Sequence, residues 1–261
     1  ISLSCKATPR GLMKYLFDSE GMAALEQLKT ARTLYAFDFD GTLCPIVPSP
    51  ESALLSESVL VRLRKLSQIA PVAVISGRSL SDLRERLDCE TIRLFGNHGA
   101  EGLLSVEAVN GATRICADWV RSLSETDTSC QAGEEFLLED KGISISLHYR
   151  LSTDRKRTRE LLEEKIARLQ PVPRVVSGKL VLNLVPEANP NKGEALRSLL
   201  ALEKLDRALF VGDDVTDEDV FSLNDERVLT VRVSPLKESK ARFFVKSQDE
   251  VENILDFLLI G

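Results

Sequence analysis

Short apolar runs alternate with segments of helical periodicity along the first hundred residues. The run at 34–37 is too apolar for a half-exposed strand, and further strands are expected at 72–75 and 92–95. Between them apolar side chains recur at helical spacing over 59–70 and 80–87, while 12–29 carries a weaker helical pattern. This alternation predicts an α/β fold with a doubly wound parallel sheet.

The pattern changes between residues 103 and 183. A helix around Trp119 is followed by strands at 136–138 and 143–149, a helix near 161–169, and strands at 175–176 and 180–185. In the strand at 143–149 the odd-numbered positions are apolar, so they should share one face. These hairpins and helices predict a small α/β domain inserted at 103–183, with a core made of 1–102 and 184–261.

The parallel pattern returns after the insertion. A helix opens at 191–193, strands are expected at 209–211 and 228–233, and an amphipathic helix covers 251–260. In a doubly wound sheet ligands bind outside the carboxyl ends of the strands. The polar clusters described next all follow apolar runs, so they should meet at that edge.

Composition narrows the classes of partner. With 261 residues, 43% of them hydrophobic, the chain can bury substantial cores, and its net charge of −6 disfavours a nucleic-acid partner. No apolar run approaches the roughly 20 residues of a membrane span. The five cysteines form no C-x-x-C pair, which indicates a reduced, cytoplasmic protein. We favour a monomer, although the sequence does not define the oligomeric state.

Two aspartates follow the first apolar run, in Asp38-Phe39-Asp40-Gly41. Residues i and i+2 of a strand share a face, so both carboxylates should reach one site. Gly41 permits a turn behind them. Such Asp-Gly pairs also occur in solvated turns. Carboxylates gathered at strand ends repel one another unless a cation neutralises them, and Mg²⁺ is the hard cation most often held by oxygen ligands.

A second acidic cluster follows the run at 209–211. Five acids lie within residues 213–219 and would repel strongly without a cation. The dipole of a helix N-terminus also favours acids, which suits Glu218 and Asp219. It accounts less well for Asp213, which follows the strand directly.

Ser76, Gly77 and Lys192 offer what a phosphate group needs. Ser76 supplies a hydroxyl and backbone N–H groups near a helix start, and Lys192 supplies a charge at another helix start. Each has an ordinary alternative, since Ser76 could be a helix N-cap and Lys192 a solvated surface residue. The two histidines, His98 and His148, lack the spacing of a zinc site.

Four ordered segments resemble the motifs of the haloacid-dehalogenase superfamily of phosphatases: Asp38-Phe39-Asp40-Gly41-Thr42, Ser76-Gly77-Arg78, Lys192-Gly193 and Gly212-Asp213-Asp214 with Asp217. Residues 96–101, 139–150 and 212–218 resemble, more narrowly, the trehalose-6-phosphate phosphatases. The resemblance covers the whole chain. It implies a Rossmann-like core with an α/β cap inserted after the second motif, which agrees with the insertion predicted at 103–183.

The resemblance implies hydrolysis of trehalose 6-phosphate to trehalose and phosphate. Asp38 would be the nucleophile that forms an aspartyl phosphate, and Asp40 would act as acid and then base. Mg²⁺ would be held by Asp38, by the backbone carbonyl of Asp40 and by Asp213. Ser76 and Lys192 would bind the remaining phosphate oxygens.

Supporting and substrate-binding roles also follow from the resemblance. Asp214 and Asp217 would orient Lys192 and the waters of the metal, with Thr42 beside them. The expected substrate-binding residues are Arg78, Asn97, His98, Glu101, Glu139, Asp140, Lys141 and Asn183.

Two of these cap positions also have a local argument. Glu139 and Lys141 are i and i+2, so on an extended strand they share a face that could bind sugar hydroxyls. The alternative is an exposed ion pair of little energetic consequence.

Asn183 departs from the family pattern. The family usually has a glutamate at this position and a basic residue at the position of Val185, whereas Pro186 is retained. An uncharged amide makes hydrogen bonds roughly half as strong as a carboxylate does. The sugar preference could therefore differ from that of typical members. Two alternatives stay open: a phosphatase for another sugar phosphate, or a catalytically silent domain that binds phosphosugars.

Overall fold

Two sheets organise the protein, whose computed structural model describes residues 13–47, 52–125, 136–178 and 180–260. The larger sheet contains β1 (Lys14–Tyr15), β2 (Thr33–Phe37), β3 (Val72–Ile75), β4 (Ile92–Phe95), β9 (Arg207–Gly212), β10 (Val228–Val233) and β11 (Phe243–Val245). Their order is β1-β11-β10-β9-β2-β3-β4, and every pairing is parallel. The predicted doubly wound parallel sheet is confirmed.

The strand order reverses direction at β2. From β2 the chain steps outward to β3 and β4, and it later returns to the other side of β2 as β9 and β10. All five residues of β2 and all four of β3 are buried, and all but Thr33 of β2 are apolar or aromatic, as a strand covered on both faces requires. The carboxyl end of β2 is therefore the switch point at which such folds bind ligands.

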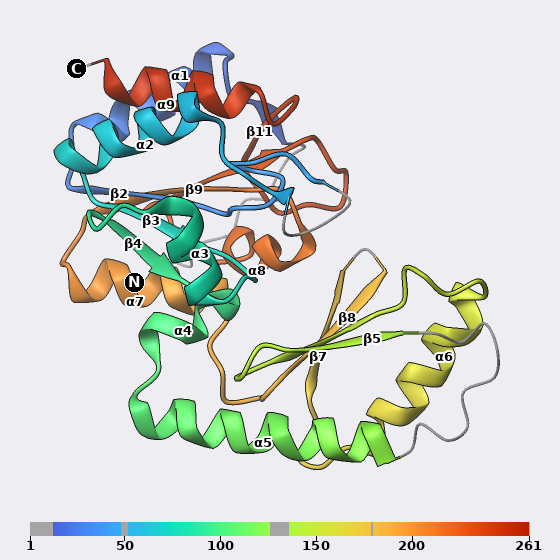
Figure 1. The fold of residues 1–261 in the computed structure, drawn as a ribbon. Coiled ribbons are helices and arrows are strands. Elements are labelled where there is room, and N and C mark those ends of the chain that lie inside the picture. The colour runs from blue at the N-terminus through green and yellow to red at the C-terminus, as the bar shows by residue number, and fades with distance from the viewer. Residues whose placement is uncertain (1–12, 48–51, 126–135, 179, 261) are drawn as a thin grey trace, which may run out of the picture.

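Helices cover both faces of the larger sheet (Figure 1). α1 (Ser19–Lys29), α2 (Glu57–Ile69), α3 (Leu80–Leu87) and α9 (Glu250–Leu259) contribute leucines, valines and isoleucines to one apolar cluster. α7 (Lys192–Leu202) and the short α8 (Glu218–Phe221) pack against the opposite face. The carboxyl end of the sheet carries loops and two 3₁₀ turns, η2 (Asn97–Gly99) and η4 (Val215–Asp217).

The smaller unit is inserted between β4 and α7. After α4 (Ala100–Leu103) it comprises α5 (Val106–Glu125), β5 (Leu137–Asp140), β6 (Ile145–His148), α6 (Arg155–Ile166), β7 (Arg174–Gly178) and β8 (Val181–Val185). Its strands form an antiparallel sheet in the order β5-β6-β8-β7. In Figure 1, α5 and α6 lie on the side of this sheet away from the core, so the other face of the sheet is turned toward the core.

The alternation predicted for the strand at 143–149 is largely confirmed. Ile145, Leu147 and Tyr149 join one buried cluster with Trp119 of α5. Ile143 instead packs with Ala100 and Ala112, near the start of the inserted unit. The intervening serines are also buried, because they face the core rather than solvent.

Three features differ most from the expectations. The segment 12–29 is not one helix, since Lys14–Tyr15 adds an edge strand to β11 before α1 begins at Ser19. The strand Phe243–Val245 had not been predicted. The expected domain boundary at 183–184 falls inside β8, which pairs with the smaller sheet as far as Val185, so we propose that the cap ends there.

Candidate active site

A buried lysine and two buried aspartates form the centre of the site. Asp38 follows β2, Asp217 ends η4, and Lys192 is the first residue of α7. The Lys192 Nζ donates to Asp38 Oδ1 at 2.7 Å and to Asp217 Oδ1 at 2.8 Å. The exposed fractions of the three residues are 1% for Lys192, 4% for Asp38 and 0% for Asp217. Lys192 is thus neither solvated nor on the surface, contrary to the ordinary alternative for a lysine.

The charges of this cluster depend on one another. Burial lowers the pKa of Lys192, but Asp217 and Asp38 more than compensate and hold it above its ordinary value, so the side chain stays an ammonium. Burial raises the pKa of Asp38 well above its usual range. The Asp217 and Asp213 carboxylates add to that rise, whereas Lys192 opposes it. One ammonium therefore faces more than one carboxylate.

The donor set fits a hard cation. One oxygen from each of Asp38, Asp213 and Asp217 lies within 4.8 Å of the others. Burial, together with Asp217 and Asp214, raises the pKa of Asp213 to about 7, which a bound cation would reverse. All the donors are carboxylate oxygens, the ligands that Mg²⁺ prefers.

Asp217 already serves several protein donors. Its Oδ2 accepts the backbone N–H groups of Asp213 and Asp214, both at 2.8 Å, in addition to the Lys192 contact at Oδ1. These bonds show that Asp217 stabilises the conformation of the loop that carries Asp213 and Asp214. Asp214 was expected to orient Lys192 as well, but its side chain is exposed at the start of η4, and the contact to Lys192 comes from Asp217.

A tight turn brings Asp40 and Asp213 together. Gly41 has a φ of +80°, and a Cβ at this position would collide with the Asp213 carboxylate. Only glycine permits both the backbone conformation and the close approach. Thr42 is fully buried, and its Oγ1 lies 3.4 Å from Asp213 Oδ1. Phe39 points into the apolar core, as the strand spacing predicts.

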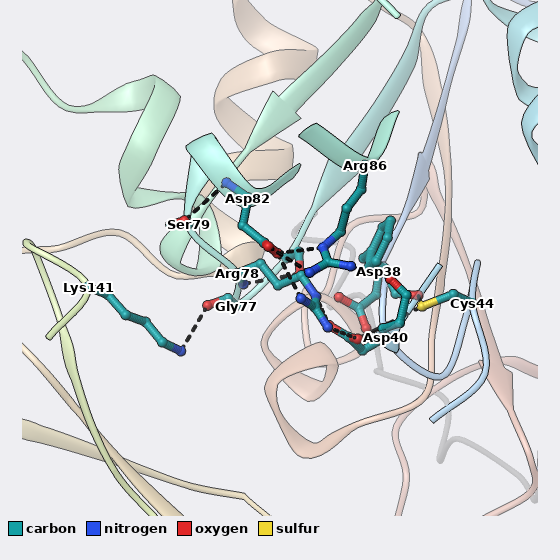
Figure 2. A network of polar contacts seen from close by, with 12 residues as sticks. Asp38, Asp40, Cys44, Gly77, Arg78, Ser79, Asp82, Arg86 and Lys141 are labelled. Atoms are coloured by element: carbon teal, nitrogen blue, oxygen red, sulfur yellow. Dashed lines mark hydrogen bonds and ion pairs between the residues drawn. The ribbon is translucent and has the colours of Figure 1, made fainter. Parts of the chain in front are cut away.

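Asp40 is held by an arginine from the next loop (Figure 2). The Arg78 Nε donates to Asp40 Oδ2 at 2.6 Å and its second terminal nitrogen donates to Oδ1 at 2.7 Å, a bidentate ion pair. The Arg78 guanidinium also lies 5.4 Å from the centre of the Phe39 ring. Arg78 had been expected to bind substrate, and in this structure it contacts Asp40.

Ser76 lies in the loop after β3 and is buried. It is not the helix N-cap, because Ser79 caps α3 by accepting the N–H of Asp82. The Ser76 Oγ accepts the backbone N–H of Arg78 at 3.2 Å. The contact of Arg78 with Asp40 brings the loop 76–78 against the segment that carries the two aspartates.

A loop with left-handed backbone covers Ser76–Arg78. Asn97 and His98 have φ values of +47° and +59°, and their N–H groups donate to Arg78 O and Ser76 O at 2.7 and 2.8 Å. The Asn97 amide donates to Glu101 at 2.9 Å and accepts from Ser144 of the cap at 2.6 Å. Asn97 and Glu101, both expected to bind substrate, therefore hold the loop, and Asn97 links it to the cap.

His98 lies over Gly77. A Cβ on Gly77 would come within 2.6 Å of His98 Cε1, so glycine is required there. The His98 Nδ1 is buried without a hydrogen-bond partner among the described residues. Burial, with the positive charges of Lys192, Lys141 and Arg174, lowers the pKa of His98 to about 3. The ring is neutral at physiological pH.

One face of the cap sheet is polar and turned toward the core. Leu147 and Leu182 lie in the apolar cluster beneath the helices, so Ser146 and Asn183, which alternate with them, lie on the other face. The register places Glu139, Ser146 and Asn183 in one row across β5, β6 and β8.

Glu139, Lys141 and His148 form the outer part of this face. The His148 Nε2 lies 2.8 Å from Glu139 Oε2, and the Lys141 Nζ lies 3.9 Å from the same oxygen. The His148 hydrogen bond, aided by the charge of Lys141, lowers the pKa of Glu139, while burial opposes the effect. The Lys141 Nζ also reaches the Gly77 carbonyl of the core at 3.4 Å. The shared face predicted for Glu139 and Lys141 agrees with these contacts.

Two expected cap residues are arranged differently. Asp140 pairs with Ile145, whose side chain is in the apolar cluster, so Asp140 lies on the face turned away from the core and accepts the N–H of Gly142. The Asn183 Oδ1 accepts the Ser146 hydroxyl at 2.6 Å, and its amide nitrogen donates to Val176 O at 3.3 Å. Asn183 is thus already engaged within the cap sheet.

Sequence reasoning missed Asp82, Arg86, Ser144 and His148. Asp82 and Arg86 lie four and eight residues after Arg78, a helical spacing that could have indicated their ion pairs. Ser144 and His148 occupy the polar positions of an alternating strand, which had been noted only for its apolar face.

Comparison with known proteins gives a consistent result. The family model described as Trehalose-phosphatase matches residues 36–249. The chain is 32% identical over 199 residues to a Mycobacterium tuberculosis protein named "Trehalose-phosphate phosphatase", with 72% of this chain and 50% of that protein covered. It is 30% identical over 230 residues to a Sinorhizobium fredii protein named "Probable trehalose-phosphate phosphatase", with 85% and 86% covered.

A solved structure titled "Crystal structure of trehalose-6-phosphate phosphatase related protein" superposes with a TM-score of 0.70 at 28% identity, covering 87% of this chain and 97% of that one. The chain spans half or less of the length of the mycobacterial proteins it matches. No helix in the described ranges is long and apolar enough to cross a membrane. On the family match and the two relatives, the chain belongs to the trehalose-phosphatase family of the haloacid-dehalogenase superfamily.

Proposed function

We propose that this protein is a Mg²⁺-dependent phosphatase that hydrolyses trehalose 6-phosphate to trehalose and phosphate. The observation that carries the proposal is the buried Asp38–Lys192–Asp217 cluster beside Asp213, at the switch point of the sheet. Such a cluster suits a reaction in which a carboxylate attacks a phosphate that carries negative charge, because cations must offset the repulsion between them.

The chain's own residues supply the two steps. Asp38 attacks phosphorus, the bond from phosphorus to the sugar oxygen breaks, and Asp40 gives that oxygen a proton. Asp40 then takes a proton from water, which attacks the phosphorus of the aspartyl phosphate and releases phosphate and free Asp38. Lys192 and Ser76 bind phosphate oxygens, and Asp217 fixes Lys192. When bound by Asp38, Asp213 and the Asp40 carbonyl, Mg²⁺ supplies positive charge at the phosphoryl group.

The cap recognises the sugar in this proposal. Glu139 and His148 lie on the polar face, with side chains 47% and 32% exposed, and hydroxyl groups of a sugar could reach them. Lys141, whose side chain is 18% exposed, lies between this face and Gly77. In this proposal the surface that recognises the sugar is separate from the reacting groups. The reacting groups can then be the same throughout the family, while the cap determines which sugar is preferred.

A second candidate, a phosphatase for another sugar phosphate, is favoured by Asn183. Its carbonyl oxygen accepts Ser146 and its amide nitrogen donates to Val176, so an uncharged, already bonded group stands where the family usually has a free acid. Asn183→Glu should therefore lower the KM for trehalose 6-phosphate about threefold, if this position contacts the sugar.

The test is phosphate release from a panel of sugar phosphates with Mg²⁺. We expect trehalose 6-phosphate to give the highest kcat/KM, and EDTA to abolish turnover. Asp38→Asn should lower kcat by at least about 1,000-fold, because no nucleophile remains. A preference for glucose 6-phosphate would replace the substrate assignment, and undiminished activity of Asp38→Asn would refute the mechanism.

A further inference from the structure

A series of ion pairs extends from Asp40 through Arg78 to Asp82 and Arg86 of α3 (Figure 2). Beyond its bidentate contact with Asp40, Arg78 donates to Asp82 Oδ2 at 2.7 Å. Arg86 donates two hydrogen bonds to the same carboxylate, at 2.9 Å to Oδ2 and at 2.8 Å to Oδ1. Arg86 also donates to the backbone carbonyl of Ala53. Charges therefore alternate along four side chains, and the last is tied to the backbone.

The two arginines of this series of ion pairs are shielded from water, and both ends of the series are fixed to the fold. The Arg78 and Arg86 side chains are each only 11% exposed, whereas Asp82 is 30% and Asp40 41% exposed. Asp82 is fixed near the N-terminus of α3, where its own N–H is capped by Ser79. Arg78 stacks near Phe39, which is buried in the core. Asp40 is the most exposed member and the one that faces the site.

We propose that Asp82 and Arg86 are positioning residues for the proton transfer at Asp40, acting through Arg78. The inference rests on the proposed function, in which Asp40 protonates the departing oxygen; when the carboxyl carries that proton, one of its oxygens gives up its Arg78 hydrogen bond and the other keeps it. Asp82 occupies the outer edge of the Arg78 guanidinium, so the inner edge stays aligned with both Asp40 oxygens. Arg86 holds Asp82 from the opposite side.

The geometry has a specific chemical consequence. A sugar alkoxide is strongly basic and departs well only when a proton arrives in the same step. Proton transfer is sensitive to position, and a displacement of about 1 Å can cost about 100-fold in rate. A nitrophenolate is weakly basic and departs without a proton. Misplacing Asp40 should therefore slow the hydrolysis of sugar phosphates far more than that of 4-nitrophenyl phosphate.

The experiment compares kcat/KM for trehalose 6-phosphate and 4-nitrophenyl phosphate at saturating Mg²⁺. If trehalose 6-phosphate is not turned over, the best sugar phosphate of the panel takes its place. For Asp82→Asn we expect a loss of about 30-fold on the sugar phosphate and no more than about 3-fold on the aryl phosphate. Arg86→Gln should follow in the same direction with a loss of about 5-fold, because it acts one contact further away.

Three controls separate positioning from damage to the fold. Asp40→Asn removes the proton carrier itself, so it gives the largest expected difference between the two substrates in the loss of kcat/KM. Asp82→Glu keeps the charge and should recover part of the sugar-phosphate activity. Glu163→Gln removes the acid of another i,i+4 ion pair, in which Arg159 and Glu163 lie 2.8 Å apart on the cap surface. It should leave kcat/KM for both substrates unchanged. Thermal unfolding midpoints show whether each variant is folded.

The outcomes separate the proton-transfer role of Asp40 from the positioning role of Asp82 and Arg86. If Asp40→Asn affects both substrates equally, Asp40 is not the proton carrier, and the proposed mechanism fails. If Asp40→Asn is selective for the sugar phosphate but folded Asp82→Asn lowers both substrates alike, the positioning role is refuted while the mechanism stands. Equal losses would show instead that the ion pairs serve phosphate binding or the general structure of the loop.

Discussion

The catalytic edge of the core and the polar face of the cap handle charge in different ways. At the catalytic edge, Lys192 and Asp38 are almost completely buried and are joined at 2.7 Å. On the cap, Glu139 and His148 are also joined, at 2.8 Å, but their side chains are 47% and 32% exposed. The contacts have similar lengths, and the difference lies in the access of water.

This difference has energetic and functional consequences. Buried charges lose their hydration, so each depends on its partners, and removing one partner is costly. An exposed pair exchanges its partner for water at small cost, typically about 0–1 kcal/mol. The core can therefore hold charged groups in fixed positions, while the cap can release its pairs to the sugar hydroxyls of the proposed substrate. Substitutions should affect stability mainly in the core and substrate affinity mainly in the cap.

Lys192→Met should give the largest effect. The variant leaves Asp38 and Asp217 buried without their shared ammonium, and we expect a loss of about 3–5 kcal/mol in the free energy of unfolding at neutral pH without metal. Phosphatase activity should become undetectable. Urea denaturation of the metal-free protein and phosphate release measure the two effects.

The matched control for Lys192→Met is Lys165→Met, which removes another buried lysine. Lys165 lies in the cap on α6, with its ammonium 5.7 Å from the Phe136 ring. We expect near-normal activity and a smaller loss of stability than in Lys192→Met. If Lys192→Met were as stable as the wild type, the picture of a mutually dependent buried cluster would be wrong.

Glu139→Ala should give an effect of the opposite kind. The side chain is half exposed, so we expect the free energy of unfolding to change by no more than about 0.5 kcal/mol. The KM for the sugar phosphate should rise about 10-fold with kcat nearly unchanged, which corresponds to about 1.4 kcal/mol of lost binding. Steady-state kinetics with thermal unfolding measures both quantities.

Glu160→Ala is the control for Glu139→Ala. Glu160 is 49% exposed on α6 and pairs weakly with Arg157 at 3.9 Å, so its charge and exposure are similar while its location is remote from the polar face. Its KM should match the wild type. A KM unchanged in Glu139→Ala would remove this residue from the substrate surface and leave its bond to His148 as an exposed pair only.

The core was more predictable from sequence than the cap face. The strands at 72–75 and 92–95 were predicted to the residue, since the first is an uninterrupted apolar run and the second is apolar at three of its four positions. β1 and β11 have two and three residues and are too short to carry a period of their own. The position of β11 depends on pairing with β10 and that of β1 on pairing with β11, and both are tertiary contacts.

The site was predictable in its residues but not in its contacts. Asp214 and Asp217 are similar acids three residues apart, and only the turn η4 buries one and exposes the other. The partner of Arg78 lies 38 residues earlier and is defined by a side-chain conformation. By contrast, the outward direction of Asp140 could have been predicted, because it alternates with Glu139 on the same strand.

His98→Asn has an effect that emerges only at acidic pH, and it tests the catalytic edge under acid. The folded-state pKa of His98 is about 3, while that of an unfolded histidine is about 6.5, so between these values the unfolded chain binds more protons. The stability contribution is fully present above about pH 6.5 and is lost as the pH falls toward 3. Asparagine tolerates the left-handed backbone at this position, where φ is +59°.

We therefore expect His98→Asn to gain stability relative to the wild type as the pH falls from 7 to 4.5. The ring is not fully covered, so the relative gain should be about 1–2 kcal/mol, or about 2–6 °C in the unfolding midpoint. His148→Gln is the control, since this ring contacts water and the Glu139 carboxylate and its loss should produce no such gain. If the difference between His98→Asn and the wild type stayed constant with pH, the folded protein would accept a proton on His98. The positive charges of Lys192, Lys141 and Arg174 would then lie too far from the ring to lower its pKa.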